Sequence, residues 1–220
     1  MNSASNGQQS RSFATRTALM EAAERLIAEH GLHGVSIKDI VREAGQKNES
    51  ALQYHFKNLA GLVDAIHARR NEETRQKRSE MLAALEAAAG SPSLRDLCGL
   101  MVYPSFLLAK TDSKFRHYVA AFSHEIALAQ NSALVRVSRS GGGGESGSRL
   151  GELLRAALSH LDEPVYRARM DLALRMCSAA MGNHVRQKNP LRGPSADFFI
   201  NNLIDGLEGL LSAPVSDPPE

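Results

Sequence analysis

The sequence predicts an all-α protein in which a small N-terminal helix-turn-helix domain is joined to a larger helical domain. Apolar residues recur at helical spacing through most of its 220 residues, and no convincing two-residue alternation indicates a strand. A glycine also separates two short helical patterns within residues 35–56. The predicted organisation is a disordered tail over 1–12, a helix-turn-helix domain over 13–58, a larger helical domain over 59–213 and a loose tail over 214–220.

The first helix of the motif carries signals for both of its ends. Ser36 and Asp39 are spaced as a capping box, in which each side chain accepts a hydrogen bond from the other residue's backbone N–H. Gly45 supplies a left-handed turn residue without a Cβ clash and predicts an abrupt end. Between these signals, apolar residues keep helical spacing at Ile37, Ile40, Val41 and Ala44.

The second helix of the motif has only a narrow apolar face. Asn48 is placed to cap it, and Leu52 and Phe56 form the face at i, i+4. Two helices at a steep angle, the second with one face free of core duties, form the arrangement in which that helix enters a DNA major groove. The residues left without a core position are Glu49, Ser50, Ala51, Gln53, Tyr54 and His55.

The three consecutive aromatic residues that end this helix have different expected roles. Phe56 is predicted to be a core residue, whereas Tyr54 is open between core and surface, because one helical face cannot bury both equally. For His55 we favour a capping or packing role for the following helix over contact with a base.

The remaining sequence predicts helices before and after the motif. One is expected over residues 15–29, and Asn58 is placed to cap a long helix whose middle, residues 71–80, is nearly all polar. That stretch is either a solvated helix face or a connector between two domains, and we favour the connector because apolar periodicity resumes on both sides. Pro104 should kink or split a helix over 94–109, and the glycine run within 136–148 predicts a flexible loop.

The last two predicted helices carry more apolar surface than one contact face needs. The surplus suggests a four-helix dimer interface, although an extra buried face within one chain explains it too. The residues expected at this interface are Met170, Leu174, Cys177, Met181, Phe199, Leu203, Leu207 and Leu210.

Methionine and phenylalanine side chains of the second domain could line an adaptable apolar pocket, with ordinary core packing as the default for each of them. With only 5% aromatic residues and no Trp, the pocket should be aliphatic or mixed in character. The candidate lining residues are Met101, Phe106, Phe115, Phe122, Met170 and Met176.

Composition indicates a chain that stays inside the cell. Two cysteines without partner spacing, Cys98 and Cys177, fit a reducing cytoplasm, and we expect neither a signal peptide nor a membrane span. Residues 1–70 hold 9 Lys/Arg against 7 Asp/Glu, and residues 71–220 hold 17 of each, so the net charge of +2 resides in the first segment. We expect no metal and no cofactor, because the scattered histidines lack companion ligands.

Residues 14–66, with the Gly45 turn and the sequence Tyr54-His55-Phe56, resemble the DNA-binding domain of the TetR family of bacterial transcriptional regulators. The rest of the chain resembles that family's ligand-binding and dimerisation domain in length and helix count. The resemblance implies a homodimer that binds a palindromic double-stranded DNA operator, usually as a repressor, and is released by a small effector. We expect that effector to be apolar.

The resemblance also implies which residues meet DNA. Groove-reading positions fall on Glu49, Ser50, Ala51, Gln53 and Tyr54, while Ser36 and Lys38 contribute from the first motif helix and Lys57 meets phosphate. Gln53 could pair with adenine through its amide, and Glu49 could accept from cytosine. The sequence departs from the common family spacing by one extra residue, which we place in the turn at Gln46–Lys47.

The alternative is an all-helical interaction protein or an enzyme in which the helix-turn-helix is only structural. Catalysis is disfavoured by the sequence, because it shows no nucleophile beside a base and no metal set. The run Gly141 to Gly144 also lacks the lysine and the preceding strand of a phosphate loop.

Overall fold

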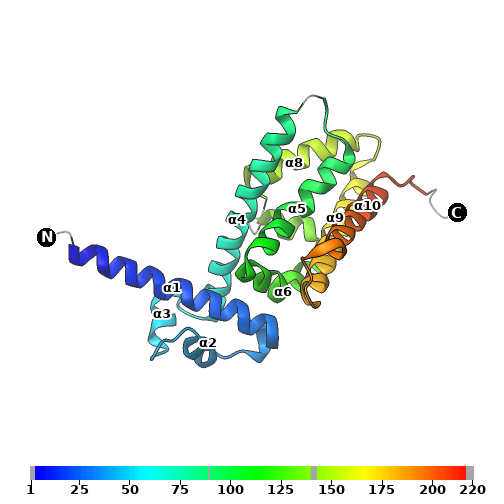
Figure 1. Ribbon diagram of the computed structural model, residues 1–220. Coiled ribbons are helices and arrows are strands. Elements are labelled where there is room, and N and C mark those ends of the chain that lie inside the picture. The colour runs from blue at the N-terminus through cyan, green and yellow to red at the C-terminus, as the bar shows by residue number, and fades with distance from the viewer. Residues whose placement is uncertain (1–2, 89, 140–142, 217–220) are drawn as a thin grey trace. The chain divides into compact units, whose positions relative to one another are not determined.

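The computed structural model describes residues 3–88, 90–139 and 143–216, and every regular element in these ranges is helical (Figure 1). The chain forms two compact units, residues 1–70 and 71–220. No helix in the described ranges is long and apolar enough to cross a membrane. The elements are α1 (Ser3–His30), the short 3-10 helix η1 (Leu32–Gly34), α2 (Ile37–Glu43), α3 (Ser50–Phe56), α4 (Leu59–Ala87), α5 (Leu94–Thr111), α6 (Ser113–Ala127), α7 (Ala133–Arg139), α8 (Gly144–Ala157), α9 (Glu163–Val185) and α10 (Gly193–Ser212).

The first unit is built around the second half of α1. Its core joins one face of α1 to α2, α3 and the first turns of α4. These buried side chains place the end of the unit inside α4, after Arg70, rather than at the predicted boundary of 58/59. The core residues are Leu19, Ala23, Ile27, Ile40, Val41, Leu52, Phe56, Leu62 and Ile66.

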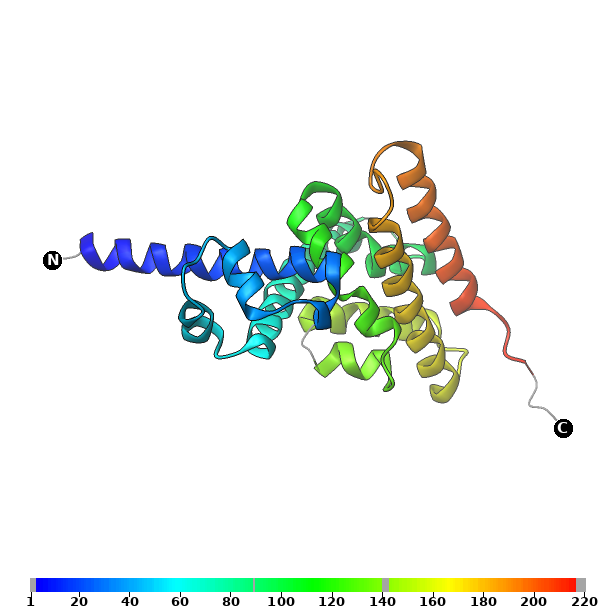
Figure 2. The ribbon, with the colours of Figure 1, turned by 90° about the horizontal axis from the view of Figure 1, so that it is seen from below.

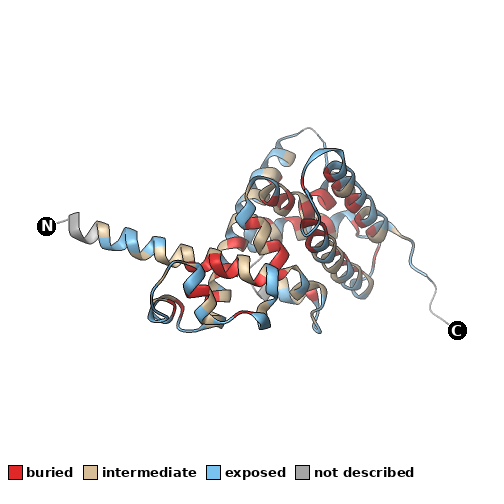
Figure 3. Cartoon of the chain, turned by 60° about the horizontal axis from the view of Figure 1, so that its bottom comes forward, coloured by how far each residue is buried: buried red, intermediate tan, exposed pale blue. Residues whose placement is uncertain are grey.

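The predicted disorder over residues 1–12 is wrong for residues 3–12. These residues extend α1 by further helical turns, and residues 7–12 are mostly exposed, as the pale blue stretch of α1 in Figure 3 shows. Adding a residue to an existing helix costs far less than nucleating one, so the packed half of α1 can support a solvated extension. Residues 1 and 2 lie outside the described ranges.

The second unit contains one helix that the sequence predicted would kink or split. Pro104 lies buried within α5, yet the helix is assigned without a break from Leu94 to Thr111. Val102 and Phe106 are buried on either side of the proline. Packing of this apolar stretch against neighbouring helices therefore outweighs the backbone hydrogen bond that proline removes.

The loop predicted over residues 136–148 is also much shorter than expected. Helix α7 continues to Arg139 and α8 begins at Gly144, so only residues 140–142 lie outside the described ranges. The start of α8 is held from α4, because Arg78 donates to the Gly143 carbonyl at 3.1 Å and the Ser146 hydroxyl donates to the Arg75 carbonyl at 3.2 Å. These tertiary hydrogen bonds offset part of the entropy cost of ordering glycines.

Helices α9 and α10 lie side by side, as the gold and orange ribbons of Figure 2 show. The structure places the predicted dimer stripe mostly inside one chain. Met170, Met181, Leu203 and Leu207 are buried, Phe199 stacks on His184, and Leu174, Cys177 and Leu210 are half-buried. The side chains that α9 and α10 leave most exposed lie off this stripe, at Leu172 and Phe198. Burial of the stripe within one chain agrees with the alternative of an extra buried face in the monomer.

Candidate nucleic-acid interface and ligand cavity

Helix α2 begins and ends with the two motifs that the sequence predicted. Ser36 and Asp39 form the capping box, and the Ser36 hydroxyl, assisted by Arg42, holds the pKa of Asp39 below its usual value. At the other end Gly45 has φ 67°, with its N–H bonded to the Arg42 carbonyl at 3.0 Å. The Gln46 N–H reaches the Val41 carbonyl at 2.9 Å, which completes a Schellman motif.

The extra residue of the turn is accommodated by polar contacts. The Gln46 side-chain amide donates to the Ala44 carbonyl at 3.3 Å, so Gln46 lies back against the end of α2. The Asn48 side chain then accepts from the Ser50 N–H at 2.9 Å, although the N-cap of α3 is Glu49 rather than the expected Asn48.

Helix α3 divides cleanly into a buried and an exposed face. Leu52 and Phe56 are buried, whereas Tyr54 keeps 81% of its surface exposed and Gln53 is exposed beside it. The open question about Tyr54 is thereby decided in favour of the surface. A helix that buries only Leu52 and Phe56 can present the opposite side to a partner without losing core packing.

His55 lies half-buried between the two faces. Its ring meets that of Tyr54 edge-on with centroids 5.0 Å apart. Burial lowers the pKa of His55, and the positive charge of Arg16 lowers it further. The Arg16 guanidinium lies 5.3 Å from the centroid of the Phe56 ring, a cation–π contact that ties α1 to the end of α3.

The connection from α3 to α4 is a strained tight turn centred on Lys57. Its backbone has φ 68° and ψ −48°, and the Asn58 N–H bonds the Phe56 carbonyl at 2.8 Å, which defines a γ-turn. The Asn58 side chain accepts from the Gly61 N–H at 2.9 Å and caps α4. A Cβ at Gly61 would lie 2.1 Å from the Phe56 carbonyl oxygen, so only glycine fits where α3 and α4 meet.

The second unit contains a partly open cavity of about 210 Å³ between α4, α5, α6, α7 and α9. Two of the six predicted pocket residues, Met101 and Phe122, line it. Phe106, Phe115 and Met170 are buried elsewhere in the core, and the Met176 methyl group lies near Gly206 of α10. The lining residues are Asn71, Thr74, Arg78, Met101, Val102, Ser105, Tyr118, Val119, Phe122, Ser123, Ile126, Val137, Leu174, Cys177, Ser178 and Met181.

The polar lining of this cavity was missed from the sequence. Asn71, Thr74 and Arg78 come from the polar middle of α4, which was assigned to a connector. Their spacing of i, i+3, i+7 places them on one helix face, and this is the signal that could have found them.

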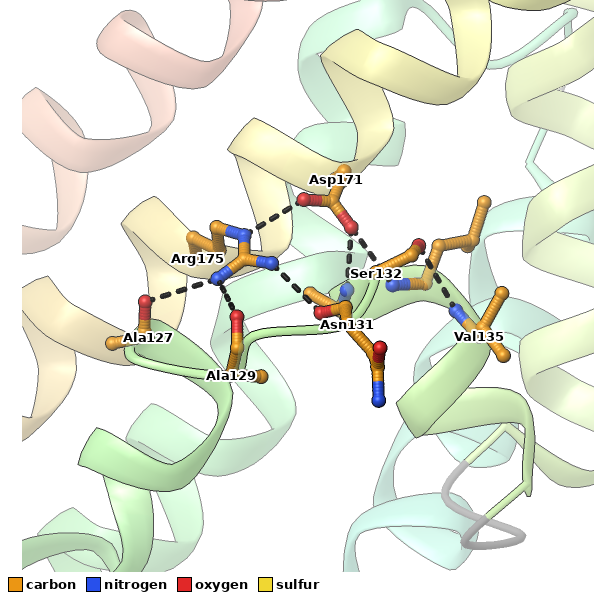
Figure 4. A network of polar contacts seen from close by, with 9 residues as sticks. Ala127, Ala129, Asn131, Ser132, Val135, Asp171 and Arg175 are labelled. Carbon is orange, nitrogen blue, oxygen red and sulfur yellow. Dashed lines mark hydrogen bonds and ion pairs between the residues drawn. The ribbon is translucent and has the colours of Figure 1, made fainter.

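A polar network on α9 supports one wall of the cavity (Figure 4). Arg175 pairs with Asp171 at 2.7 Å and donates to the carbonyls of Ala127, Ala129 and Asn131. Asp171 accepts from the first N–H groups of α7 at Ala133 and Leu134. Burial tends to raise the pKa of Asp171, but these hydrogen bonds lower it on balance. The network fixes the connection between α6 and α7, the two helices that carry Ile126 and Val137 into the lining.

Comparison with known proteins supports the assignment of the first unit. The family described as bacterial regulatory proteins, tetR family, matches residues 19–66. Three solved structures with TetR-family assignments also resemble the chain over most of its length. The structure from Rhodococcus sp. has a TM-score of 0.58 and 17% sequence identity, and the match covers 90% of this chain and 99% of that chain. The structure from Shewanella sp. PV-4 has a TM-score of 0.59 and 17% identity, with 89% of this chain and 96% of that chain covered. The structure from Marinobacter aquaeolei VT8 has a TM-score of 0.57 and 15% identity, with 92% of this chain and 97% of that chain covered.

Residues 19–66 carry the DNA-binding domain of the tetR family of bacterial regulatory proteins. The helix-turn-helix covers 19–66, and the similarity to solved structures extends the fold to the helical second unit. A comparison with curated proteins found no match. No group of three or more His, Cys, Asp or Glu residues in the described ranges is placed to hold a metal.

The nine residues predicted to meet DNA lie on α2, α3 and their ends. Ala51 and His55 are half-buried, and the other seven are exposed. Sequence reasoning missed Arg16, whose contact with Phe56 depends on how α1 packs. The exposed residues of the set are Ser36, Lys38, Glu49, Ser50, Gln53, Tyr54 and Lys57.

Proposed function

We propose that this chain is a TetR-family transcriptional regulator that binds a palindromic operator as a homodimer and acts as a repressor that a small molecule releases. The observation that carries DNA reading is the exposed face of α3, where Gln53 and Tyr54 stand opposite the buried Leu52 and Phe56. Binding to bacterial chromosomal DNA places the protein in the cytoplasm.

The residues of this face have distinct proposed roles. Gln53 reads adenine and Glu49 accepts from cytosine, with Ser50, Ala51 and Tyr54 beside them in the major groove. Ser36, Lys38 and Lys57 contact phosphate and set the register of α3, while His55 supports the end of the helix.

Dimerisation is proposed through the outward faces of α9 and α10. Leu172 keeps 54% of its surface exposed and Phe198 72%, an unusual exposure for large apolar side chains. A Cβ at Gly209 would have nothing within 4 Å, so the outer face of α10 is smooth enough for close approach of a partner helix. A twofold axis through this surface buries the same patch on both chains.

Effector control is proposed to act through α4. This helix runs from Leu59 to Ala87, so it contributes Leu62 and Ile66 to the core of the first unit and Asn71, Thr74 and Arg78 to the cavity of the second. A ligand that binds one conformation of the cavity better than another shifts the position of this shared helix.

Operator binding can be tested by fluorescence anisotropy with DNA from upstream of the protein's own coding sequence. We expect the affinity for this DNA to be well above that for a shuffled duplex. The logarithm of the binding constant should fall linearly with the logarithm of the salt concentration, with a slope of roughly −1 for each phosphate neutralised. Gln53→Ala should weaken the operator more than the shuffled duplex, whereas Lys38→Ala should weaken both alike. Equal binding of operator and shuffled DNA would overturn the proposal of a specific operator.

The dimer can be tested by sedimentation velocity of the wild type and of Leu172→Glu. A twofold interface predicts a dimer for the wild type and a large shift toward monomer for the variant, because the added charge would be buried against its symmetry mate. The matched control is Leu128→Glu, at a side chain that is 77% exposed on a different part of the same unit. A monomeric wild type would contradict the assignment.

A further inference from the structure

The cavity of the second unit contains one charged side chain among its described lining residues. Arg78 contributes that charge, and no Asp or Glu belongs to the lining. Its terminal Nη1 donates to the Gly143 carbonyl at 3.1 Å. The remainder of the cavity wall therefore offers the guanidinium no carboxylate.

The guanidinium of Arg78 is incompletely satisfied. Its Nε is buried and has no hydrogen-bond partner among the described residues. Burial lowers the pKa of Arg78, and the nearby charge of Arg75 lowers it further, which shows that its surroundings disfavour the cation. A buried donor on a charged group carries a desolvation penalty unless an acceptor reaches it.

The rest of the cavity fits a small body that is mostly apolar. Met101, Phe122, Leu174 and Met181 supply apolar walls. The volume of about 210 Å³ exceeds the roughly 150 Å³ that suffices for benzene in an engineered cavity, so one ring or a short branched chain with one polar substituent fits. Inorganic anions would leave these walls unfilled.

We propose that the effector is a small organic anion, a carboxylate on a single-ring or short aliphatic body, whose charge meets Arg78. This inference rests on the proposed ligand-responsive function and replaces the apolar effector expected from the sequence. A carboxylate in the cavity can accept from the terminal N–H groups of Arg78, and such charge-assisted pairs are stronger than neutral hydrogen bonds. An organic cation would meet like charge, and a neutral hydrocarbon would leave the Arg78 guanidinium without an anionic partner.

The test compares matched pairs of probes that differ only in charge. Binding of benzoate, benzamide, hexanoate and hexanamide to the full-length protein is followed by isothermal titration calorimetry at neutral pH. We expect at least one carboxylate to bind roughly ten- to hundredfold more tightly than its amide, the range of a charge-assisted hydrogen bond. If no carboxylate is preferred over its amide, including the case in which none of the four binds, the proposal is overturned.

Three variants assign the preference to a residue. Arg78→Gln should abolish it, and Arg78→Lys should retain part of it, because lysine keeps the charge but loses the fork. The matched control is Arg75→Gln, which removes a positive charge one helical turn from Arg78. Arg75 pairs with Glu72 and does not line the cavity. A preference that persists in Arg78→Gln, or that disappears equally in Arg75→Gln, would overturn the assignment. Thermal unfolding of each variant without ligand verifies that it is folded.

Operator binding separates this inference from the proposed function. Arg78→Gln should still bind operator but should no longer be released by the carboxylate that releases the wild type. If the wild type fails to bind operator while the carboxylate preference depends on Arg78, the proposed anion site is supported and the proposed repressor function is wrong. Release of both proteins alike by the same neutral probe would overturn the anion site and leave the repressor intact.

Discussion

The Glu24 carboxylate and the Arg70 guanidinium form a buried two-point ion pair across the core of the first unit. Arg70 Nε lies 2.7 Å from Glu24 Oε1, and Nη2 lies 2.7 Å from Oε2. The two side chains are 0% and 1% exposed. A second guanidinium, that of Arg69, lies 3.6 Å from the same carboxylate. The pair links α1 to α4 at the point where the first unit ends.

Removing one member of this pair should be costly. Arg70→Met leaves the Glu24 carboxylate buried with a weaker partner, and we expect unfolding free energy to fall by about 3–5 kcal/mol in urea titrations. The double variant Glu24→Leu with Arg70→Met should recover most of that loss, because neither charge remains. Arg25→Met, which breaks the exposed pair between Arg25 and Glu43 at 2.7 Å, should cost less than about 1 kcal/mol. Equal losses in the single and double variants would contradict this account.

Replacing Lys57 should separate stability from DNA binding. Its positive φ is accessible to glycine without strain, so Lys57→Gly should raise the free energy of unfolding by about 1 kcal/mol. The same change removes a proposed phosphate contact. It should therefore reduce the slope of log binding constant against log salt concentration by about one. Chemical unfolding and anisotropy at several salt concentrations measure the two effects. Unchanged DNA affinity in a stabilised variant would remove Lys57 from the interface.

Gly61 and Gly151 should respond to alanine in opposite directions. At Gly61 the new Cβ would meet the Phe56 carbonyl oxygen, which is backbone and cannot swing aside, so Gly61→Ala should destabilise by about 1–3 kcal/mol or more. At Gly151, within α8, a Cβ would have nothing within 4 Å, and Gly151→Ala should stabilise by up to about 1 kcal/mol through helix propensity. Thermal unfolding distinguishes the outcomes. Similar effects of both changes would show that the turn at Lys57 yields to the clash.

Local features of the first unit were predictable because their partners lie within a few residues. The Ser36–Asp39 capping box, the Gly45 turn and the Asn58 cap all depend on spacings of four residues or fewer, and the structure confirms each of them. Phe56 was assigned to the core for a similar reason, since Leu52 lies one turn before it.

Features that depend on tertiary packing were not predictable from the sequence. The Glu24–Arg70 pair spans 46 residues, and nothing local marks either charge as buried. Likewise Leu174, Cys177 and Met181 formed an apolar stripe that fits a partner chain as well as a cavity in the same chain. The stripe's period shows that one face is apolar, but only the position of α5 and α6 decides what covers it.

His184 should make stability depend on pH in the mildly acidic range. It is buried, and its ring stacks on that of Phe199 with centroids 3.6 Å apart. Burial lowers the pKa of His184, and a hydrogen bond with the Pro190 backbone opposes this only in part. Its Nε2 has no hydrogen-bond partner among the described residues, so a proton added there would have no acceptor.

The sign of the effect follows from proton binding. An unfolded histidine titrates near pH 6.5, and the folded chain holds His184 at a lower pKa, so the unfolded state takes up the proton first. Stability is therefore complete above about pH 6.5 and falls as the pH drops from there through the folded pKa. His184→Phe keeps a ring against Phe199 and removes the titrating group, so it should flatten the stability curve between about pH 7.5 and 5, measured by urea unfolding. Parallel curves for the wild type and the variant would show that other groups govern acid sensitivity in this range.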